Sequence, residues 1–398
     1  MSGLKDLLEA DGIARAPELN AFDTAVNQKI DAFFPDVNVK IHVPTPELKD
    51  VFSKGTIKVY EQQLPIGRDV GSLGHGAQRS IQMALIQHLA QIKRANQNNL
   101  TTTLLLIDEP ELYLHPQAIE IVRVALKFLS TQGYQVIFST HTALMLTHED
   151  VANAVLVRKN NQVGTHRRQT LKAAIPQIEH DAPSQIQLLF SLTNSSNILF
   201  SERVILTEGQ TEERILPKLI ELISGRTLAL LKYALVRQGG VDNTRKSMMV
   251  LNVMDLPTKA IVDIDYVLKN GIRDGLIQAN NLDLIAIKQH LSQINVAQNI
   301  TLGNDGWPQK NQIVSAAKAF QLLSAEPQIA GNIDNLHVLL LGQNIWFWKR
   351  GTIEAHLGIT SKNEQAWSAF VNQIIQNPWQ GVVADSQSIQ DCINWIVN

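Results

Sequence analysis

The sequence predicts an α/β protein in which short buried strands alternate with helices and form parallel sheets. Two continuous apolar runs, at 102–108 and 134–140, are typical of parallel strands that are buried on both faces. From residue 203 onward, strand-like and helix-like segments alternate in a β-α-β rhythm. The chain has 398 residues, of which 44% are apolar, so it is long enough for two or three domains with separate cores.

The composition limits the classes of function. Charged residues make up 18% of the chain and the net charge is −2, which argues against a basic coat that binds nucleic acid without specificity. A local patch or bound metal ions would still allow DNA binding. The single cysteine, Cys392, excludes an internal disulfide framework and a zinc cluster, and it fits a reducing cytosol. Residues 1–30 do not resemble a signal peptide, and no run approaches the roughly 18 apolar residues of a membrane span. We therefore expect a soluble cytoplasmic protein without a membrane partner.

The first part of the chain is predicted to mix helices with two kinds of strand. The predicted helices are 4–33, 76–96 and 116–131. The predicted strands are 37–43 and 56–62, which alternate like antiparallel strands, then the buried runs 102–108 and 134–140, then a hairpin at 154–168.

The second part follows a polar stretch at 169–200, which we expect to hold short connecting helices. The predicted strands are 203–209, 234–237, 260–265 and 337–342. The predicted helices are 211–224, 244–254, 362–376 and 386–397, with residues 281–325 mostly helical. No internal repeat or low-complexity segment is present.

Two neighbouring strand ends carry the residue types of a nucleotide-hydrolysing site. The run at 102–108 ends in Asp108 and Glu109, at the edge where nucleotides bind in α/β sheets. The aspartate can hold Mg²⁺, and the glutamate can orient and deprotonate the attacking water. The next buried strand is followed by His141, which can reach a γ-phosphate. Upstream, the glycine-rich turn SLGHGAQRS at 72–80 opens a helix, whose N-terminus favours anions.

Together these elements resemble the signature motif, Walker B motif and switch histidine of ABC and SMC-like ATPases. LLLIDEPELYLHP at 104–116 is typical of the branch that includes the overcoming-lysogenization-defect (OLD) nucleases. The resemblance implies the C-terminal lobe of an ABC-type head. The nucleotide-binding residues that it implies are Gly74, His75, Gly76, Gln78, Asp108, Glu109 and His141. His75 stands where the usual signature has a serine, which puts the γ-phosphate contact in doubt.

The phosphate-binding loop of such a head is absent from the sequence. No G-x-x-x-x-G-K-[ST] pattern occurs. We therefore expect this chain to be a truncation or one half of a split protein, and to bind ATP only when another segment or polypeptide supplies that loop. Since ATP is shared between two heads in this class, a homodimer or higher oligomer is implied.

A second group of acidic residues follows two of the later strands. Glu208 ends the strand at 203–209, and Glu212 follows at helical spacing on the first turn of the next helix. Asp263 and Asp265 end the strand at 260–265, where alternation predicts that both point to the same side. Carboxylates gathered at one sheet edge repel each other unless divalent cations neutralise them.

A strand-borne glutamate followed by Asp-x-Asp resembles the Toprim domain, and an ABC lobe followed by Toprim resembles the OLD family. The resemblance implies that KRGTIEAHL at 349–357 brings Thr352 and Glu354 to a second metal ion. It also implies a lysine that stabilises transition-state charge, for which Lys362 is the candidate and Lys349 the alternative. The implied domains are an ATPase part at 1–170, a helical linker at 171–200 and a Toprim domain at 201–398, with a helical insertion at about 270–335.

The function predicted from this is an ATP-regulated DNA endonuclease or nickase that defends against phage or other foreign DNA. Two Mg²⁺ or Mn²⁺ ions, about 4 Å apart, would clamp the scissile phosphate. The predicted catalytic residues are Glu208, Asp263, Asp265, Lys362 and, for ATP, Glu109. The predicted metal ligands are Glu208, Glu212, Asp263, Asp265, Thr352 and Glu354. The alternative is a non-catalytic DNA-binding scaffold that uses ATP-driven dimerisation. With either function, the expected protein partners include a separate polypeptide that carries the phosphate-binding loop or another component of a defence system.

Overall fold

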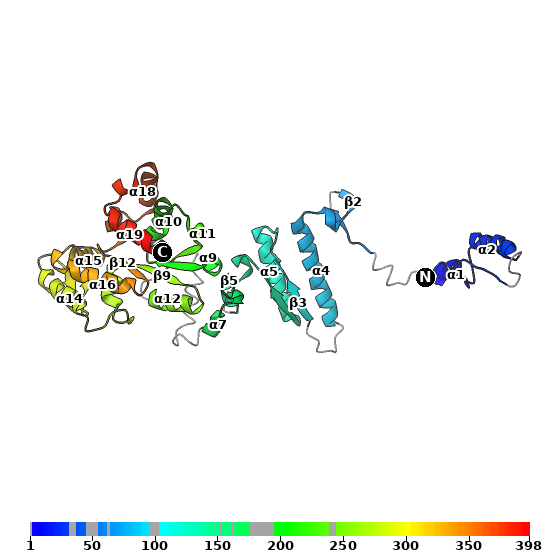
Figure 1. Cartoon of the computed structure of the whole chain (residues 1–398), viewed down its shortest axis with the longest axis horizontal. Coiled ribbons are helices and arrows are strands. Elements are labelled where there is room, and N and C mark those ends of the chain that lie inside the picture. The colour runs from blue at the N-terminus through cyan, green and yellow to red at the C-terminus, as the bar shows by residue number, and fades with distance from the viewer. Residues whose placement is uncertain are drawn as a thin grey trace. The chain divides into compact units, whose positions relative to one another are not determined.

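The computed structural model describes residues 2–31, 37–44, 55–61, 64–95, 103–151, 153–160, 162–174, 195–238 and 244–398 (Figure 1). It divides into two compact units, Met1–Ile86 and Gln87–Asn398. The boundaries predicted at 170 and 200 lie inside the second unit and stay a prediction. None of the described helices is long and apolar enough to cross a membrane.

The first unit begins with two helices where the sequence predicted a single one. Helix α1 covers Ser2–Leu8 and α2 covers Pro17–Ile30. The prediction of one helix at 4–33 was wrong because Pro17 starts a new helix, at a position where its missing N–H costs nothing.

The predicted strand at 37–43 is also wrong, since residues 37–44 form no strand. Its backbone is held instead by side chains of α2. Asn27 exchanges two hydrogen bonds with the Val39 backbone, at 2.7 and 2.9 Å. Asp23 accepts the Ile41 N–H at 3.0 Å. The alternating apolar residues therefore led to the prediction of a strand, but this segment forms its hydrogen bonds with side chains of α2 and not with another strand.

The rest of the first unit is a hairpin followed by the start of a long helix. Strands β1 (Lys58–Glu61) and β2 (Leu64–Asp69) are antiparallel, and β2 was not predicted. A short 3-10 turn, Val70–Ser72, leads to α4, which covers His75–Ala95 and continues into the second unit.

The second unit opens with a small parallel pair. Strands β3 (Thr103–Ile107) and β4 (Tyr134–Phe138) pair in parallel, with α5 (Pro116–Thr131) between them in the chain. The predicted hairpin is present as β5 (Val157–Asn160) and β6 (Gly164–Arg167). Short helices follow β4 and flank the linker, namely α6 (His148–Val151), α7 (Leu171–Ala174) and α9 (Ser195–Phe200). Linker residues 175–194 lie outside the described residues. The connecting helices expected there therefore stay a prediction.

The largest element of the fold is a parallel sheet of four strands in the order β12-β9-β7-β8. Its strands are β7 (Arg203–Thr207), β8 (Tyr233–Arg237), β9 (Thr258–Asp263) and β12 (Ile345–Trp348). The helices that connect the first three are α10 (Gln210–Ser224), α11 (Leu228–Leu231) and α12 (Thr244–Val253).

Two apolar clusters lie on the opposite faces of this sheet. Alternate strand residues such as Leu206 and Val262 pack on α12, and those such as Ile205 and Ile261 pack on α10 and the C-terminal helices. Figure 1 shows α10, α18 and α19 on one side of the sheet and α12 on the other. Because both faces are covered, the strands consist mainly of apolar residues.

Between β9 and β12 the chain forms a mainly helical insertion. It consists of α13 (Ile264–Asn270), α14 (Leu282–Ile294), a two-stranded hairpin β10–β11 (Thr301–Leu302 and Pro308–Gln309), α15 (Ala316–Ser324) and α16 (Ala330–Leu341). After β12 come α17 (Ile353–Leu357), α18 (Glu364–Gln376) and α19 (Ser386–Val397).

The predicted strand at 337–342 is wrong, because this run is the end of α16. Ile333, Leu336, His337 and Leu340 recur at helical spacing and are buried. The fourth strand is the next apolar run, IWFW at 345–348, which pairs with β9. A short apolar run does not by itself distinguish a strand from a buried helical turn.

Candidate metal centre

Three carboxylates meet at the carboxyl ends of β7 and β9. Glu208 directly follows β7, Asp263 is the last residue of β9, and Asp265 lies in the first turn of α13. One oxygen atom from each lies within 4.8 Å of the other two. Glu208 Oε2 also accepts the Asp263 N–H at 3.0 Å, which ties the two strand ends together. The edge of the sheet thus holds a group that could bind a cation.

The two aspartates come together for a different reason from the one predicted. Strand alternation was expected to turn Asp263 and Asp265 to the same side. In the structure the strand ends at Asp263, and α13 begins at Ile264. The change from strand to helix brings the two carboxylates together, and the Asp265 carboxylate accepts the Tyr266 N–H at 3.0 Å.

Glu212 lies next to this group, on the first turn of α10, and is 2% exposed. Its Oε1 atom accepts a hydrogen bond from Trp348 Nε1 at 3.2 Å, which joins α10 to the end of β12. A Cβ atom on Gly209 would lie 2.8 Å from Glu212 Oε2. A side chain at position 209 would therefore displace this carboxylate beside the turn after β7.

The segment after β12 brings Thr352 and Glu354 to the same region, and both are buried. Thr211 Oγ1 donates to Glu354 Oε1 at 2.5 Å and itself accepts from Trp367 Nε1 at 3.1 Å. Gly351 begins this segment with a φ of 102°, in the region that favours glycine.

Of the two lysine candidates, Lys362 lies at the acidic group and Lys349 does not. Lys362 Nζ lies 3.0 Å from Glu354 Oε2. Although burial opposes it, the charge of Glu354 raises the pKa of Lys362, so this lysine remains charged. Lys349 instead pairs with Asp334 at 2.7 Å.

The carboxylates in this region hold their protons more strongly than isolated ones. Burial and the charge of Asp265 raise the pKa of Glu208 to about 8. Burial and the charge of Glu354 raise the pKa of Glu212 to about 7. Burial also raises the pKa of Asp265, and together with the charge of Glu208 it raises that of Asp263 well above its usual value.

Glu354 is the exception in this group. Burial acts to raise its pKa, but the Thr211 hydroxyl and the Lys362 charge outweigh burial and lower it. The carboxylate of Glu354 is therefore ionised, whereas its acidic neighbours resist ionisation while they face one another.

These residues fit a divalent cation. Asp263 Oδ1 is buried and has no hydrogen-bond partner among the described residues. Buried polar atoms normally have partners, and a hard cation bound through oxygen atoms would supply one. Such a cation would also offset the burial and repulsion that raise the pKa values of Glu208 and Asp263.

The residues predicted to handle ATP form a separate and more exposed group. At the end of β3, the Asp108 carboxylate accepts a hydrogen bond from the Ser139 hydroxyl. The Ser139 hydroxyl oxygen in turn accepts the Glu109 N–H at 3.1 Å. His141 Nε2 lies 3.1 Å from Glu109 Oε1, and the histidine side chain is 84% exposed. The structure thus brings Asp108, Glu109 and His141 together.

Glu109 adopts a φ of 42°, which is uncommon for a residue with a side chain. Such strain persists only where surrounding contacts hold it, and it is frequent at functional sites. One residue of this group, Glu111, was not predicted from the sequence. Its Oε1 atom accepts from Thr140 Oγ1 at 2.6 Å and from the His141 N–H at 2.9 Å, and so fixes the turn after β4.

The predicted signature turn lies in the first unit. Helix α4 begins at His75, and Gly74 and Gly76 flank this start. The Gln78 side chain donates to the Leu73 carbonyl at 2.7 Å, which closes the turn. The nucleotide-binding roles of Gly74, His75, Gly76 and Gln78 stay a prediction.

Comparison with known proteins agrees with this arrangement. Residues 199–265 match the family described as "Overcoming lysogenization defect protein-like, TOPRIM domain", and residues 7–146 match the family described as "AAA ATPase domain". Over 409 aligned residues the chain is 36% identical to the Old nuclease of Escherichia phage P2. The alignment covers 100% of this chain and 68% of the phage protein. The chain belongs to the OLD family of nucleases. The predicted order of an ATPase domain followed by a Toprim domain is confirmed.

Three residues that hold the acidic side chains of this OLD protein were not predicted. They are Thr211, Trp348 and Trp367. Thr211 lies between Glu208 and Glu212 in the run EGQTEE, so its position beside candidate ligands was the one available signal. The two tryptophans act through the indole N–H, and nothing in their sequence neighbourhood indicates which carboxylate or hydroxyl they reach.

Proposed function

We propose that this chain is a metal-dependent DNA endonuclease or nickase whose reaction takes place in the Toprim domain. The observation that supports this most is the convergence of Glu208, Asp263 and Asp265 within 4.8 Å, in a region where burial and repulsion raise their pKa values. Carboxylate oxygens suit Mg²⁺ and Mn²⁺. The name of the phage P2 relative supports a nuclease, and DNA as the substrate is part of the proposal.

The proposed site holds two cations on two sets of residues. Glu208, Asp263 and Asp265 would hold one, and Glu212, Thr352 and Glu354 would hold the other. From the sequence alone, Glu208, Glu212 and either Asp263 or Asp265 were expected to hold one ion, and the remaining aspartate with Thr352 and Glu354 the other. The grouping of Asp263 with Asp265 favours the division proposed here. When bound, divalent cations supply a more acidic water and stabilise the charge on the leaving oxygen.

The chain's own side chains orient the ligands and add positive charge. Thr211 and Trp367 fix one oxygen of Glu354, and Trp348 fixes one oxygen of Glu212. Residues that orient metal ligands in this way set the geometry of a site. Lys362, held beside Glu354, would place a permanent positive charge near a scissile phosphate.

We further propose that the ATPase domain regulates the nuclease. Asp108 would hold Mg²⁺ on the nucleotide, and Glu109 would orient water beside His141. Gly74, His75, Gly76 and Gln78 would contact ATP across a homodimer, with the phosphate loop supplied by another segment or polypeptide. A role in defence against foreign DNA in the cytoplasm completes the proposal.

The decisive experiment compares plasmid cleavage by the wild-type chain and by Glu208→Ala, with Mg²⁺ or Mn²⁺. The wild type is expected to nick or linearise the plasmid, and the variant is expected to leave it supercoiled. Glu221→Ala is the matched control, since Glu221 lies on α10 and pairs with Lys218 away from the site. Cleavage by Glu208→Ala at the wild-type rate would contradict the proposal. Binding of DNA without cleavage under either metal would favour the scaffold function.

A further inference from the structure

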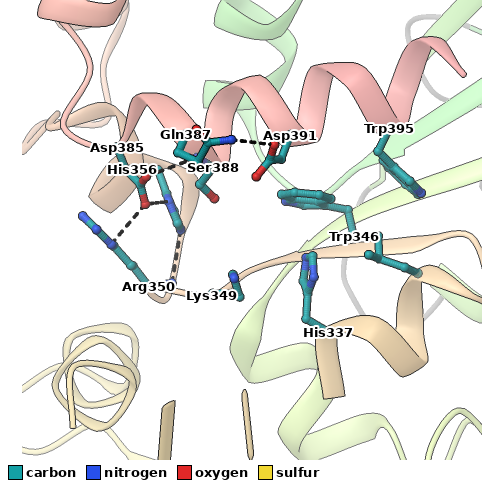
Figure 2. Close-up of a pocket in the computed structure, with 11 residues that line it drawn as sticks. His337, Trp346, Lys349, Arg350, His356, Asp385, Gln387, Ser388, Asp391 and Trp395 are labelled. Atoms are coloured by element: carbon teal, nitrogen blue, oxygen red, sulfur yellow. Dashed lines mark hydrogen bonds and ion pairs between the residues drawn. The ribbon is translucent and has the colours of Figure 1, made fainter. Parts of the chain in front are cut away.

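A pocket lies on the Toprim domain, lined by none of the candidate metal ligands. It has a volume of about 510 Å³ and lies along β12, the edge strand of the four-stranded sheet. Its walls come from β12 and the turn after it, from α16, and from α19. Figure 2 shows the rings of Trp346 and His337 one above the other, below the helix that carries Ser388 and Asp391.

Two buried polar atoms of this pocket have no hydrogen-bond partner within the described residues. They are Nε2 of His337 and Nε1 of Trp346, in side chains that are 6% and 3% exposed. The indole N–H can only donate, so it calls for an acceptor. Burial lowers the pKa of His337 to about 4, with the charge of Lys349 adding to this, so its ring is neutral near pH 7. Buried polar atoms in proteins rarely lack a hydrogen-bond partner, and a bound molecule could supply partners for these two.

The pocket is lined by two cations and two carboxylates. Lys349 and Arg350 lie at its rim, with side chains that are 38% and 57% exposed. The carboxylate of Asp385 is already engaged by Arg350 Nε at 3.1 Å and by His356 Nδ1 at 2.9 Å. Asp391 accepts a hydrogen bond from Gln387 at 2.9 Å. Lys349 pairs in turn with Asp334 at 2.7 Å, and both cations keep further N–H donors for a phosphate.

The remaining wall is aromatic. The rings of Trp346 and Trp395 lie 5.9 Å apart, and His337 meets Trp346 edge-on at 4.5 Å. Trp395 is only partly buried, so part of its ring borders the pocket. Three features of the pocket match a flat ring system that is attached to a phosphate. The aromatic surface suits the ring face, the unpaired polar atoms suit hydrogen-bonding atoms on the ring edge, and the cations at the rim suit the phosphate.

We propose that this pocket binds a nucleotide, with its base against the aromatic wall and its phosphate beside Lys349 and Arg350. The nucleotide could belong to the DNA strand or be free in solution. The first source rests on the nuclease function proposed above. From Arg350 to Glu354 the chain spans at most about 14 Å. At 3.4 Å per nucleotide along one strand of B-DNA, a strand at the metal centre would reach the pocket within about four nucleotides.

The test is calorimetric titration of the full chain, without divalent metal, with three probes. These are a single-stranded DNA of about twelve nucleotides, 5′-dAMP and inorganic phosphate. Trp346→Phe removes the unpaired N–H and keeps an aromatic ring, and Lys349→Ala removes a rim charge on the surface. Trp307→Phe is the control, because Trp307 is equally buried but lies outside the pocket. Each pocket variant is expected to weaken nucleotide binding about tenfold, and the control is expected to leave it unchanged.

The probes also identify the source of the nucleotide. Tighter binding of the oligonucleotide than of 5′-dAMP supports the DNA strand, and the reverse supports a free nucleotide. The proposal is overturned if neither nucleotide binds, if inorganic phosphate binds as tightly as both, or if Lys349→Ala and Trp346→Phe both bind like the wild type. Because no metal is present, these outcomes are independent of whether Glu208→Ala stops cleavage.

Discussion

Two strands of this chain end in an acidic residue after nearly the same apolar run, LLLID at 104–108 and VILTE at 204–208. The leucine two residues before the carboxylate is exposed in the first run and buried in the second. Leu106 is 66% exposed and Leu206 is 0% exposed. Strand β3 pairs with β4 alone among the described strands, whereas β7 lies between two strands and has helices on both faces. An apolar run therefore predicts a strand, but what covers the sheet decides how deeply the carboxylate at its end is buried.

The largest expected contrast is in metal binding. Asp263→Asn is expected to weaken the tightest Mn²⁺ site at least about a hundredfold, since loss of a ligand exceeds the 10–100-fold typical of the groups that orient ligands. Asp108→Asn, the same change at the end of β3, is expected to leave that site unchanged when ATP is absent. Calorimetric titration with Mn²⁺ measures both. Equal losses in the two variants would mean that the strand ends do not differ as the burial indicates.

A smaller loss of activity is expected from the residues that orient the ligands. Thr211→Val removes the hydrogen bond to Glu354 and Trp348→Phe removes the one to Glu212. Each is expected to lower metal-dependent plasmid cleavage by about 10–100-fold. Trp379→Phe is the matched control, because Trp379 is buried elsewhere in the same core cluster. If the control loses as much activity as Trp348→Phe, the effect comes from packing and not from the hydrogen bond.

The third contrast concerns stability. Leu206→Ala is expected to lower the free energy of unfolding by about 2–5 kcal/mol, because it leaves a cavity in a closed core. Leu106→Ala is expected to change it by less than about 0.5 kcal/mol. All six tryptophans lie at or after residue 307, so their fluorescence follows the Toprim domain, and circular dichroism follows the whole chain. A comparable loss in Leu106→Ala would show that the face of β3 is covered in solution.

The smallest effect is the dependence of cation stabilisation on pH. Glu208 has a folded-state pKa of about 8 against an ordinary value of 4.5, so the metal-free fold loses stability as the pH rises between these values. A cation binds the ionised form and reverses this loss. Mg²⁺ is therefore expected to raise Tm by more at pH of about 8.5 than at pH of about 6. Glu208→Gln should remove most of that difference, and an equal rise at both pH values would contradict it.

The sequence was sufficient for the elements that depend on local patterns. The parallel strands at 103–107, 134–138 and 203–207 were predicted within two residues, as were the helices at 116–131 and 210–224. The strand at 345–348 was missed because the preceding run, ending at Leu341, is also apolar and satisfies a buried helix equally well. The hairpin partner β2 was missed because Pro65 and Gly67 interrupt any alternating pattern.

The composition of the acidic group was easier to predict than its geometry. Acidic residues at strand ends are visible in the sequence, because the carboxyl ends of parallel strands meet at one edge. The pairing of Asp263 with Asp265 through the start of α13 depends on where the strand stops, and boundaries are poorly encoded locally. The contact between Thr211 and Glu354 joins residues 143 positions apart, which no local pattern records.

That contact has a consequence for how the enzyme is made. The acidic group draws on the first strand of the Toprim sheet and on the segment after its last strand, with the helical insertion between them. A nascent or cleaved chain that ends before Gly351 would carry Glu208 and Asp263 but not Glu354. Closure of so long a loop is slow compared with local folding. The proposed metal centre would therefore be complete only after the whole domain has been synthesised and folded.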